Sequence, residues 1–125
     1  MVPQAQFYGF KDQEFVEEKM KSASIVVIPS IWEEPFGLVA AEAMSNGACI
    51  IASKVGGIPE IIKDNGILID KINLKKLSSK IDLLIDNNKL RENYQRKSWE
   101  NFKFSSEKSS QKLDHYREFI ISNYF

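Results

Sequence analysis

Residues 25–29 form the run Ile-Val-Val-Ile-Pro, in which four apolar residues follow one another without a polar residue between them. Such a run is typical of a strand buried on both faces, as in a parallel sheet, and the proline ends it. A second apolar run covers residues 48–52 (Ala-Cys-Ile-Ile-Ala), and a shorter one covers residues 67–69 (Ile-Leu-Ile). The sequence therefore indicates several buried strands in the first half of the chain.

Helical patterns separate these apolar runs. Asp12 is a candidate N-cap for a helix over residues 13–22, which has apolar residues on one face. Residues 36–46 have the pattern of a second helix, and Pro59 is well placed in the first turn of a short third one. Residues 5–10 read as a further short strand upstream. The alternation predicts the α/β class, with a doubly wound, Rossmann-like parallel sheet of about four strands.

The second half of the chain has a different character. From residue 73 to residue 125 no strand pattern occurs, and apolar residues recur at helical spacing among polar ones. We expect three amphipathic helices there, the last of them capped by Ser105 or Ser106. The prediction is one domain, with an α/β core over residues 1–70 and a helical tail over residues 71–125.

Charge and cysteine content exclude several classes of protein. The 17 Lys and Arg residues are balanced by 17 Asp and Glu residues, so the formal net charge is zero. A nucleic-acid-binding protein needs a surplus of basic residues to displace counterions, and we expect no nucleic-acid partner. Cys49 is the single cysteine, which rules out an intrachain disulfide. Its apolar neighbours predict a small buried hydrophobic residue, not a nucleophile.

The sequence shows neither the pattern of a membrane-spanning segment nor that of a signal peptide. No apolar stretch approaches the roughly 18–20 residues that span a bilayer. The first residues lack the positive region and the apolar segment of a signal peptide. We therefore expect a cytoplasmic protein, and an association with a membrane surface through regions outside this chain stays open.

The stretch from Pro29 to Met44 leaves a buried strand through a loop and enters a helix. In an open parallel sheet, ligands collect at the carboxyl ends of the strands. Free backbone N–H groups at the helix start, near Phe36, Gly37 and Leu38, attract phosphate. A glycine there has no Cβ, so a ligand can approach the backbone closely.

Two carboxylates flank this helix start. Glu42 has small or apolar neighbours nearly all round the helix, and a buried carboxylate is costly unless donors such as sugar hydroxyls partner it. A glutamate at the helix edge, facing solvent or forming a structural salt bridge, is the alternative. Glu34 lies about 12 Å from Glu42 if the helix is continuous, so the pair is spaced to hold the two ends of a diphosphate-containing ligand. Alternatively, Glu34 stabilises the helix start.

Several short motifs follow one another along the first half of the chain. They are Pro-Ser at 29–30, Glu-Pro-Phe-Gly at 34–37, Glu-Ala at 42–43, Val-Gly-Gly-Ile-Pro-Glu at 55–60 and Asn-Gly-Ile-Leu at 65–68. In this order, and with seven residues between Glu34 and Glu42, the chain resembles the family-4 retaining glycosyltransferases, which have the GT-B fold. The resemblance runs from about residue 7 to residue 70 and identifies the chain as an incomplete C-terminal donor-binding domain.

The resemblance implies a set of donor-binding residues: Glu34, Pro35, Phe36, Gly37, Leu38, Glu42, Gly56 and Gly57. Glu34, as the catalytic residue, would contact hydroxyls of the transferred sugar, and Glu42 would bind the ribose. Backbone groups between them would hold the diphosphate, with Gly56 and Gly57 in a nearby loop. The family is generally metal-independent, so the resemblance implies no metal and no cofactor. The donor would be a UDP-, GDP- or ADP-sugar.

The chain also departs from the family. The family's donor domain begins further upstream with an Arg/Lys pair, and its N-terminal acceptor domain is absent here. We therefore expect the isolated chain to be inactive. A non-catalytic interaction module, or half of a split enzyme that needs a separate acceptor domain, is the alternative function. The Glu34/Glu42 spacing disfavours a GT-B epimerase or phosphorylase. The last helix either crosses back to the acceptor domain or packs on the present sheet.

Overall fold

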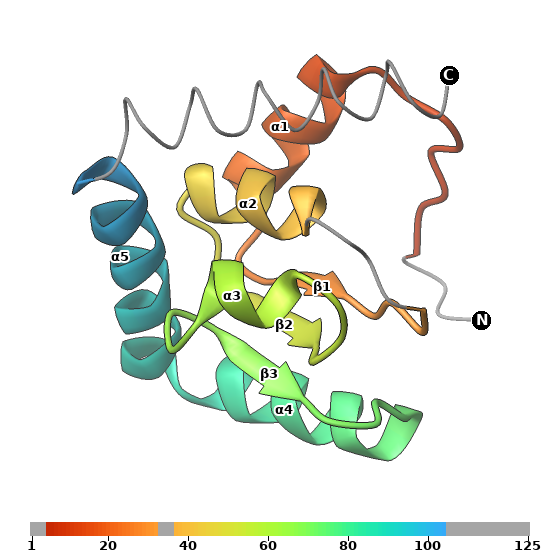
Figure 1. Cartoon of the computed structure of the whole chain (residues 1–125), viewed down its shortest axis with the longest axis vertical. Coiled ribbons are helices and arrows are strands. Elements are labelled where there is room, and N and C mark those ends of the chain that lie inside the picture. The colour runs from red at the N-terminus through yellow and green to blue at the C-terminus, as the bar shows by residue number, and fades with distance from the viewer. Residues whose placement is uncertain (1–4, 33–36, 105–125) are drawn as a thin grey trace.

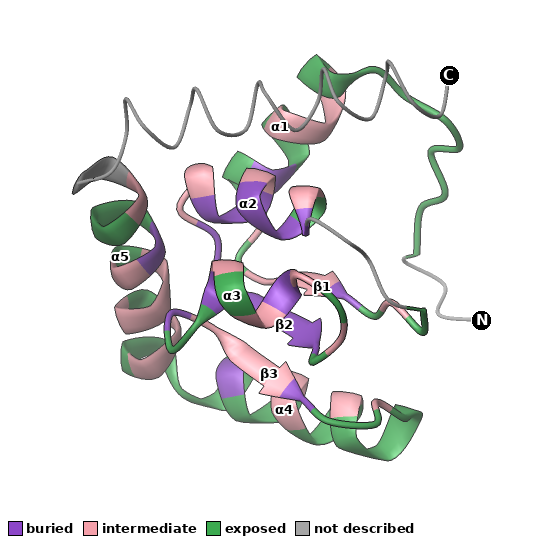
Figure 2. Ribbon diagram, in the orientation of Figure 1, coloured by how far each residue is buried: buried purple, intermediate pink, exposed green. Residues whose placement is uncertain are grey.

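The computed structural model describes residues 5–32 and 37–104, with only the backbone at residues 103 and 104. The described residues contain a parallel sheet of three strands in the order β1-β2-β3. These strands are β1 (Val26–Ile28), β2 (Ile50–Ser53) and β3 (Ile67–Ile69). β2 is the central strand and all four of its residues are buried, as the purple ribbon of Figure 2 shows. This confirms the predicted α/β class and the parallel sheet.

Five helices accompany the sheet in the described residues. They are α1 (Gln13–Ser22), α2 (Leu38–Ser45), α3 (Ile58–Ile62), α4 (Leu74–Asp86) and α5 (Asn88–Phe104). Figure 1 shows α1, α2 and α3 on one side of the sheet and α4 on the other, with α5 along its flank. The sheet therefore lies between two helical layers, as a doubly wound arrangement requires.

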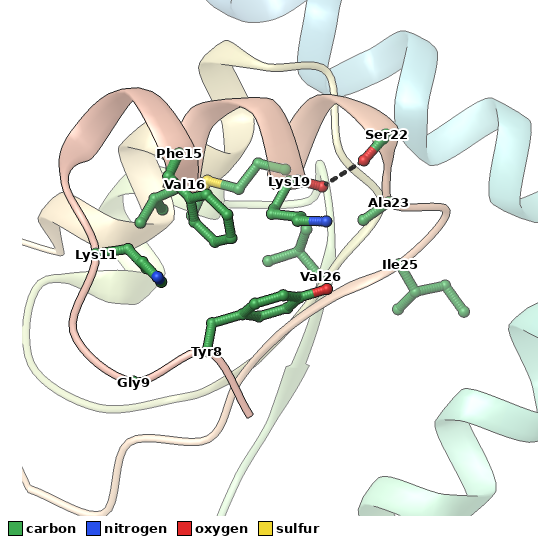
Figure 3. A pocket seen from close by; sticks show the side chains of 11 residues that line it. Tyr8, Gly9, Lys11, Phe15, Val16, Lys19, Ser22, Ala23, Ile25 and Val26 are labelled. Carbon is green, nitrogen blue, oxygen red and sulfur yellow. Dashed lines mark hydrogen bonds between the residues drawn. The ribbon is translucent and has the colours of Figure 1, made fainter. Parts of the chain in front are cut away.

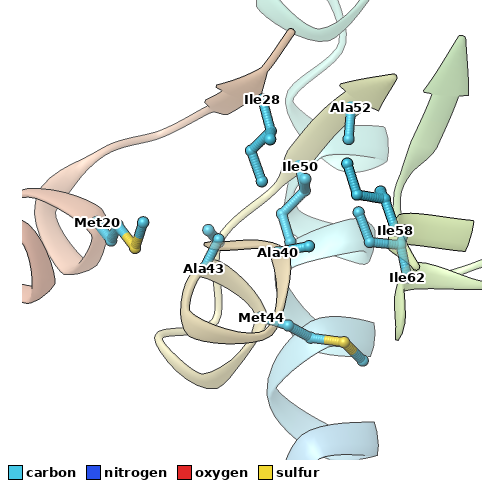
Figure 4. Close-up of a cluster of buried hydrophobic side chains, with 10 residues drawn as sticks. Met20, Ile28, Ala40, Ala43, Met44, Ile50, Ala52, Ile58 and Ile62 are labelled. Carbon is cyan, nitrogen blue, oxygen red and sulfur yellow. The ribbon is translucent and has the colours of Figure 1, made fainter. Parts of the chain in front are cut away.

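Alternating strand residues feed two separate apolar clusters. Ile28, Ile50 and Ala52 join residues of α1, α2 and α3 in the first cluster, which Figure 4 shows between these elements. Cys49, Ile51 and Ile69 join Leu84 of α4 in the second cluster. Because successive side chains of a strand point to opposite faces, continuous apolar runs supply both clusters at once. This is why the strands lack polar residues at every other position.

The strand predicted over residues 5–10 is wrong. Residues 5–9 have no regular structure, and the side chains of Phe7 and Phe10 are 84% and 101% exposed. Gly9 has φ 68°, outside the extended region that a strand needs. A lone extended segment is stable only beside a partner strand, and this one has no partner within the described residues. The sheet described here consequently has three strands, not about four.

The other predicted elements agree with the structure to within a few residues. The helix over residues 13–22 matches α1, and the side chain of Asp12 accepts a hydrogen bond from Phe15 N at 2.9 Å. The strand predicted over residues 48–52 begins two residues later, because Ala48 N donates to Ala43 O at the end of α2. Two of the three helices expected in the tail are α4 and α5. The third, expected after Ser105 or Ser106, lies outside the described residues.

Candidate functional site

The carboxyl ends of the three strands lie side by side and are tied together by hydrogen bonds. The buried hydroxyl of Ser53, at the end of β2, donates to Ile28 O of β1 at 3.4 Å. The backbone N–H of Lys54 donates to Ile69 O of β3 at 3.0 Å. This edge is where an open parallel sheet presents its ligands, and the predicted site residues follow β1 and β2 there.

Gly37 is the point at which the chain enters α2. It is buried and has φ 63° and ψ 36°, in the left-handed region. Its carbonyl accepts from Ala41 N at 3.0 Å, which is the first bond of the helix. A Cβ at this position would lie 3.1 Å from Gly57 O and 3.3 Å from Ile58 Cα. On its Cβ side, Gly37 therefore faces the backbone of Gly57 and Ile58. The approach of a ligand to the backbone of Gly37 stays a prediction.

This contact brings two predicted site segments together. Gly37 follows β1, whereas Gly57 follows β2 and directly precedes α3. Gly56 has φ 53° and is exposed, and Ile58 N donates to Val55 O at 3.2 Å, which closes a turn over these residues. The loop around Gly56 and Gly57 is therefore a tight turn packed against the start of α2.

The start of α2 differs from the starts of α1 and α4. Side chains of Asp12 and Asn73 cap α1 and α4 through hydrogen bonds to backbone N–H groups. Within the described residues, no side chain makes such a bond at the start of α2. The first N–H groups of a helix have no partner inside the helix; that those of α2 bind an anionic group of a ligand stays a prediction.

Glu42 lies on the less buried face of α2. The helix buries Ala40, Ala41, Ala43 and Met44 against the core and its neighbours. Residues three and four apart share a helix face, so Glu42, which is half-buried, lies beside Leu38 and Val39. Val39 is 42% exposed. The prediction that this helix is buried on most faces is confirmed, and Glu42 occupies the remaining face in the second turn of the helix.

Glu34, Pro35 and Phe36 lie outside the described residues. The facing arrangement of the carboxylates of Glu34 and Glu42 therefore stays a prediction. Of the eight predicted donor-binding residues, the structure places five: Gly37, Leu38 and Glu42 on or at α2, and Gly56 and Gly57 at the turn packed against it. Their roles in binding a donor stay predictions.

Sequence reasoning missed one charged side chain at this edge. Lys54 is exposed and follows the last residue of β2, so it stands at the carboxyl end of the central strand. The signal that could have found it is its position directly after a buried apolar run, where the next side chain reaches the ligand-binding edge.

The described residues include neither a cluster of metal ligands nor an exposed thiol. No group of three or more His, Cys, Asp or Glu side chains in residues 5–32 and 37–104 is arranged to hold a metal ion. Cys49 is fully buried. Burial raises the pKa of its thiol from 9.0 to about 11, against a smaller lowering by Arg91. The prediction that Cys49 is a buried hydrophobic residue is confirmed.

Comparison with known proteins identifies the family. Residues 2–100 match the family described as Glycosyl transferases group 1. This match covers most of the chain, and the chain belongs to that family. In the part of the chain that the structure describes, no helix is both long and apolar enough to cross a membrane.

Individual relatives carry related names. The chain is 38% identical to an uncharacterized glycosyltransferase of Methanocaldococcus jannaschii over 106 residues, which cover 76% of this chain and 27% of that protein. It is 31% identical to a D-inositol 3-phosphate glycosyltransferase of Nocardioides sp. over 92 residues, which cover 72% of this chain and 20% of the relative. The chain thus spans about a quarter of the length of these relatives or less.

Proposed function

We propose that this chain forms the donor-binding part of a retaining glycosyltransferase of family 4, which transfers a sugar from a nucleoside diphosphate sugar to an acceptor. Membership in the group 1 glycosyl transferases supports sugar transfer. The observation that carries the proposal is the junction of Gly37 with Gly57 at the carboxyl edge of the sheet. It fixes the uncapped start of α2 beside a second loop, with Glu42 in the next turn.

In this proposal, the N–H groups of α2, Glu42 and Glu34 each bind a different part of the donor. The free N–H groups and the positive dipole end of α2 favour the diphosphate at Gly37 and Leu38. Glu42 accepts hydrogen bonds from the ribose hydroxyls, which compensates for the partial burial of its carboxylate. Glu34 holds the hydroxyls of the transferred sugar. As the bond to the sugar breaks, the same N–H groups stabilise the charge that develops on the leaving diphosphate.

The proposed reaction also involves regions of the family's proteins outside residues 1–125. An N-terminal acceptor domain would close the cleft and bind the acceptor, and upstream cationic residues would hold the diphosphate. The isolated chain is therefore proposed to bind a donor without transferring its sugar, with no metal or cofactor. A cytoplasmic location, a membrane-surface association through regions outside the chain, and the identity of the base belong to the same proposal.

A second candidate is a non-catalytic module or one half of a split enzyme. Such a module would associate with a separate acceptor domain without responding to nucleotides. The response to nucleotides therefore discriminates between a donor-binding part and a non-catalytic module.

Thermal unfolding of the full chain with uridine, guanosine or adenosine diphosphate tests the proposal. One nucleotide should raise the melting temperature by several degrees, since a ligand at 100 times its dissociation constant adds about 2.7 kcal/mol. Glu42→Ala should remove most of this rise. Glu92→Ala, which removes an exposed carboxylate from α5, is the matched control and should retain it. If none of the three nucleotides raises the melting temperature, or if Glu42→Ala responds like the unaltered chain, the donor-site assignment fails.

A further inference from the structure

A groove with a volume of about 540 Å³ lies between α1, the segment around Tyr8, and the residues that lead into β1. Figure 3 shows the ring of Tyr8 between α1 and the backbone at Ile25 and Val26. We call this feature the α1 groove. It shares no residue with the Gly37–Gly57 junction described above. Its volume falls within the range of roughly 300–1,000 Å³ that is typical of small-molecule sites.

Most of the walls of the α1 groove are apolar. Phe15, Val16 and the buried Met20 line it from α1, and Ile25 lines it from the segment that leads into β1. The rings of Tyr8 and Phe15 pack edge to face, with centroids 5.0 Å apart. Hydrocarbon placed against such walls is removed from water together with the walls, which favours its binding. The groove therefore suits a ligand with an apolar body.

Two lysines add positive charge to the α1 groove. The ammonium groups of Lys11 and Lys19 each lie 5.5 Å from the centroid of the Phe15 ring. The ammonium group of Lys19 also lies 4.8 Å from the centroid of the Tyr8 ring. Both cations therefore converge on the aromatic wall of the groove. An aromatic ring attracts a cation but carries no net charge, so the rings leave both positive charges uncompensated.

Acidic side chains do not compensate these charges either. Among the described residues, none that lines the α1 groove is acidic. On a helix, the neighbours of a side chain lie three and four positions away. For Lys19 these neighbours all line the groove, and they are Phe15, Val16, Ser22 and Ala23. The charge of the groove is therefore complementary to an anion.

We propose that the α1 groove binds an amphipathic anion with a single hydrocarbon chain, of the class of a medium-chain fatty acid. The apolar walls cover the chain, and the ammonium groups of Lys11 and Lys19 pair with the anionic head. Such a pair beside apolar walls is screened less than one in bulk water. A purely polar anion would leave the walls wet, and a neutral chain would leave the lysines unpaired. This site does not depend on the proposed sugar donor.

Isothermal titration calorimetry of the full chain with monomeric octanoate tests the proposal. One octanoate should bind per chain. Acetate has the head without the chain, and octanol has the chain without the charge, so each should bind about tenfold more weakly or worse. No binding of octanoate, or equal affinity for octanol, would overturn the proposal. Binding to phosphatidylglycerol vesicles without binding of monomeric octanoate would assign the groove to a membrane surface and would also overturn it.

Charge reversal tests the position of the anionic head. Lys19→Glu should weaken octanoate binding by about tenfold or more, because it replaces a charged partner by a repelling one. Lys19→Arg keeps the cation and should keep most of the affinity. Lys21→Glu changes an exposed lysine of α1 outside the groove, so it is the matched control and should bind like the unaltered chain. Equal affinity in the Lys19→Glu and Lys21→Glu variants would contradict the assignment.

A chemical measurement on the unaltered chain covers the case in which Lys19→Glu fails to fold. Bound octanoate should slow the acetylation of Lys11 and Lys19 by acetic anhydride severalfold, as read by mass spectrometry, and should leave that of Lys21 unchanged. Equal rates with and without octanoate would place the ligand elsewhere and overturn the proposal. No nucleotide takes part in these experiments, so their failure leaves the donor-site proposal untouched.

Discussion

Gly9 and Gly37 share a left-handed backbone, with φ 68° and 63°, but differ in their surroundings. A Cβ at Gly9 would meet nothing within 4 Å, whereas a Cβ at Gly37 would lie 3.1 Å from Gly57 O. The left-handed conformation costs a residue other than glycine roughly 1–2 kcal/mol. The two positions therefore separate the cost of the backbone conformation from the cost of the contact.

We expect Gly37→Ala to lower the free energy of unfolding by about 2–4 kcal/mol, the sum of backbone strain and overpacking against Gly57. Gly9→Ala should cost about 1–2 kcal/mol or less, since only the backbone term applies. Urea denaturation of the two variants measures both values. Equal losses would mean that the Gly37–Gly57 contact is not tight, which would weaken the basis of the candidate site.

At the scale of the helices, side-chain capping separates α4 from α2. The side chain of Asn73 accepts a hydrogen bond from Lys76 N at 2.8 Å at the start of α4. Gly37 has no side chain to offer at the start of α2. The start of α4 is therefore stabilised by a side-chain cap, whereas that of α2 has none from Gly37.

Asn73→Ala should lower the free energy of unfolding by about 1 kcal/mol, because it leaves a backbone donor of α4 without its acceptor. Asn73→Ser should retain most of the stability, since a serine hydroxyl accepts the same bond. Thermal unfolding of both variants measures the difference. A serine variant as unstable as the alanine variant would show that something other than the cap matters at this position.

Helices and central strands were predictable from the sequence because their signals are local. Asp12 is followed by an amphipathic pattern, and Ile50 and Ile51 lie in an unbroken apolar run. The segment over residues 5–10 failed because a strand also needs a neighbour in space, which local pattern does not supply. The residues at the start of α2 were identified from the order of the motifs along the sequence. The contact of Gly37 with Gly57 could not be predicted, because it depends on how the loops after two different strands pack.

For the molecule as a whole, stability depends on two apolar clusters that share one sheet. Leu84 is fully buried in the second cluster, between α4 and the sheet, whereas the neighbouring Leu83 is 43% exposed. The sequence shows two adjacent leucines and does not by itself say which one faces the core. The structure assigns that role to Leu84.

Leu84→Ala should lower the free energy of unfolding by about 2–5 kcal/mol, because it removes buried methyl groups and leaves a cavity. Leu83→Ala should cost much less, within about 1 kcal/mol. Equilibrium denaturation monitored by circular dichroism measures both. Similar losses for the two leucines would contradict the placement of α4 against the sheet.

Among the described residues, β1 has β2 as its single neighbour. Val26 N donates to Cys49 O at 2.8 Å, so the amide groups of Val27, the alternate residue, turn away from the sheet. Unpaired strand edges template the attachment of further strands, and natural proteins blunt them with proline or charge. Pro29 limits the unprotected length to a few residues. With outward-facing amide groups only at Val27, this edge is consequently expected to offer too short a template for a further strand to attach.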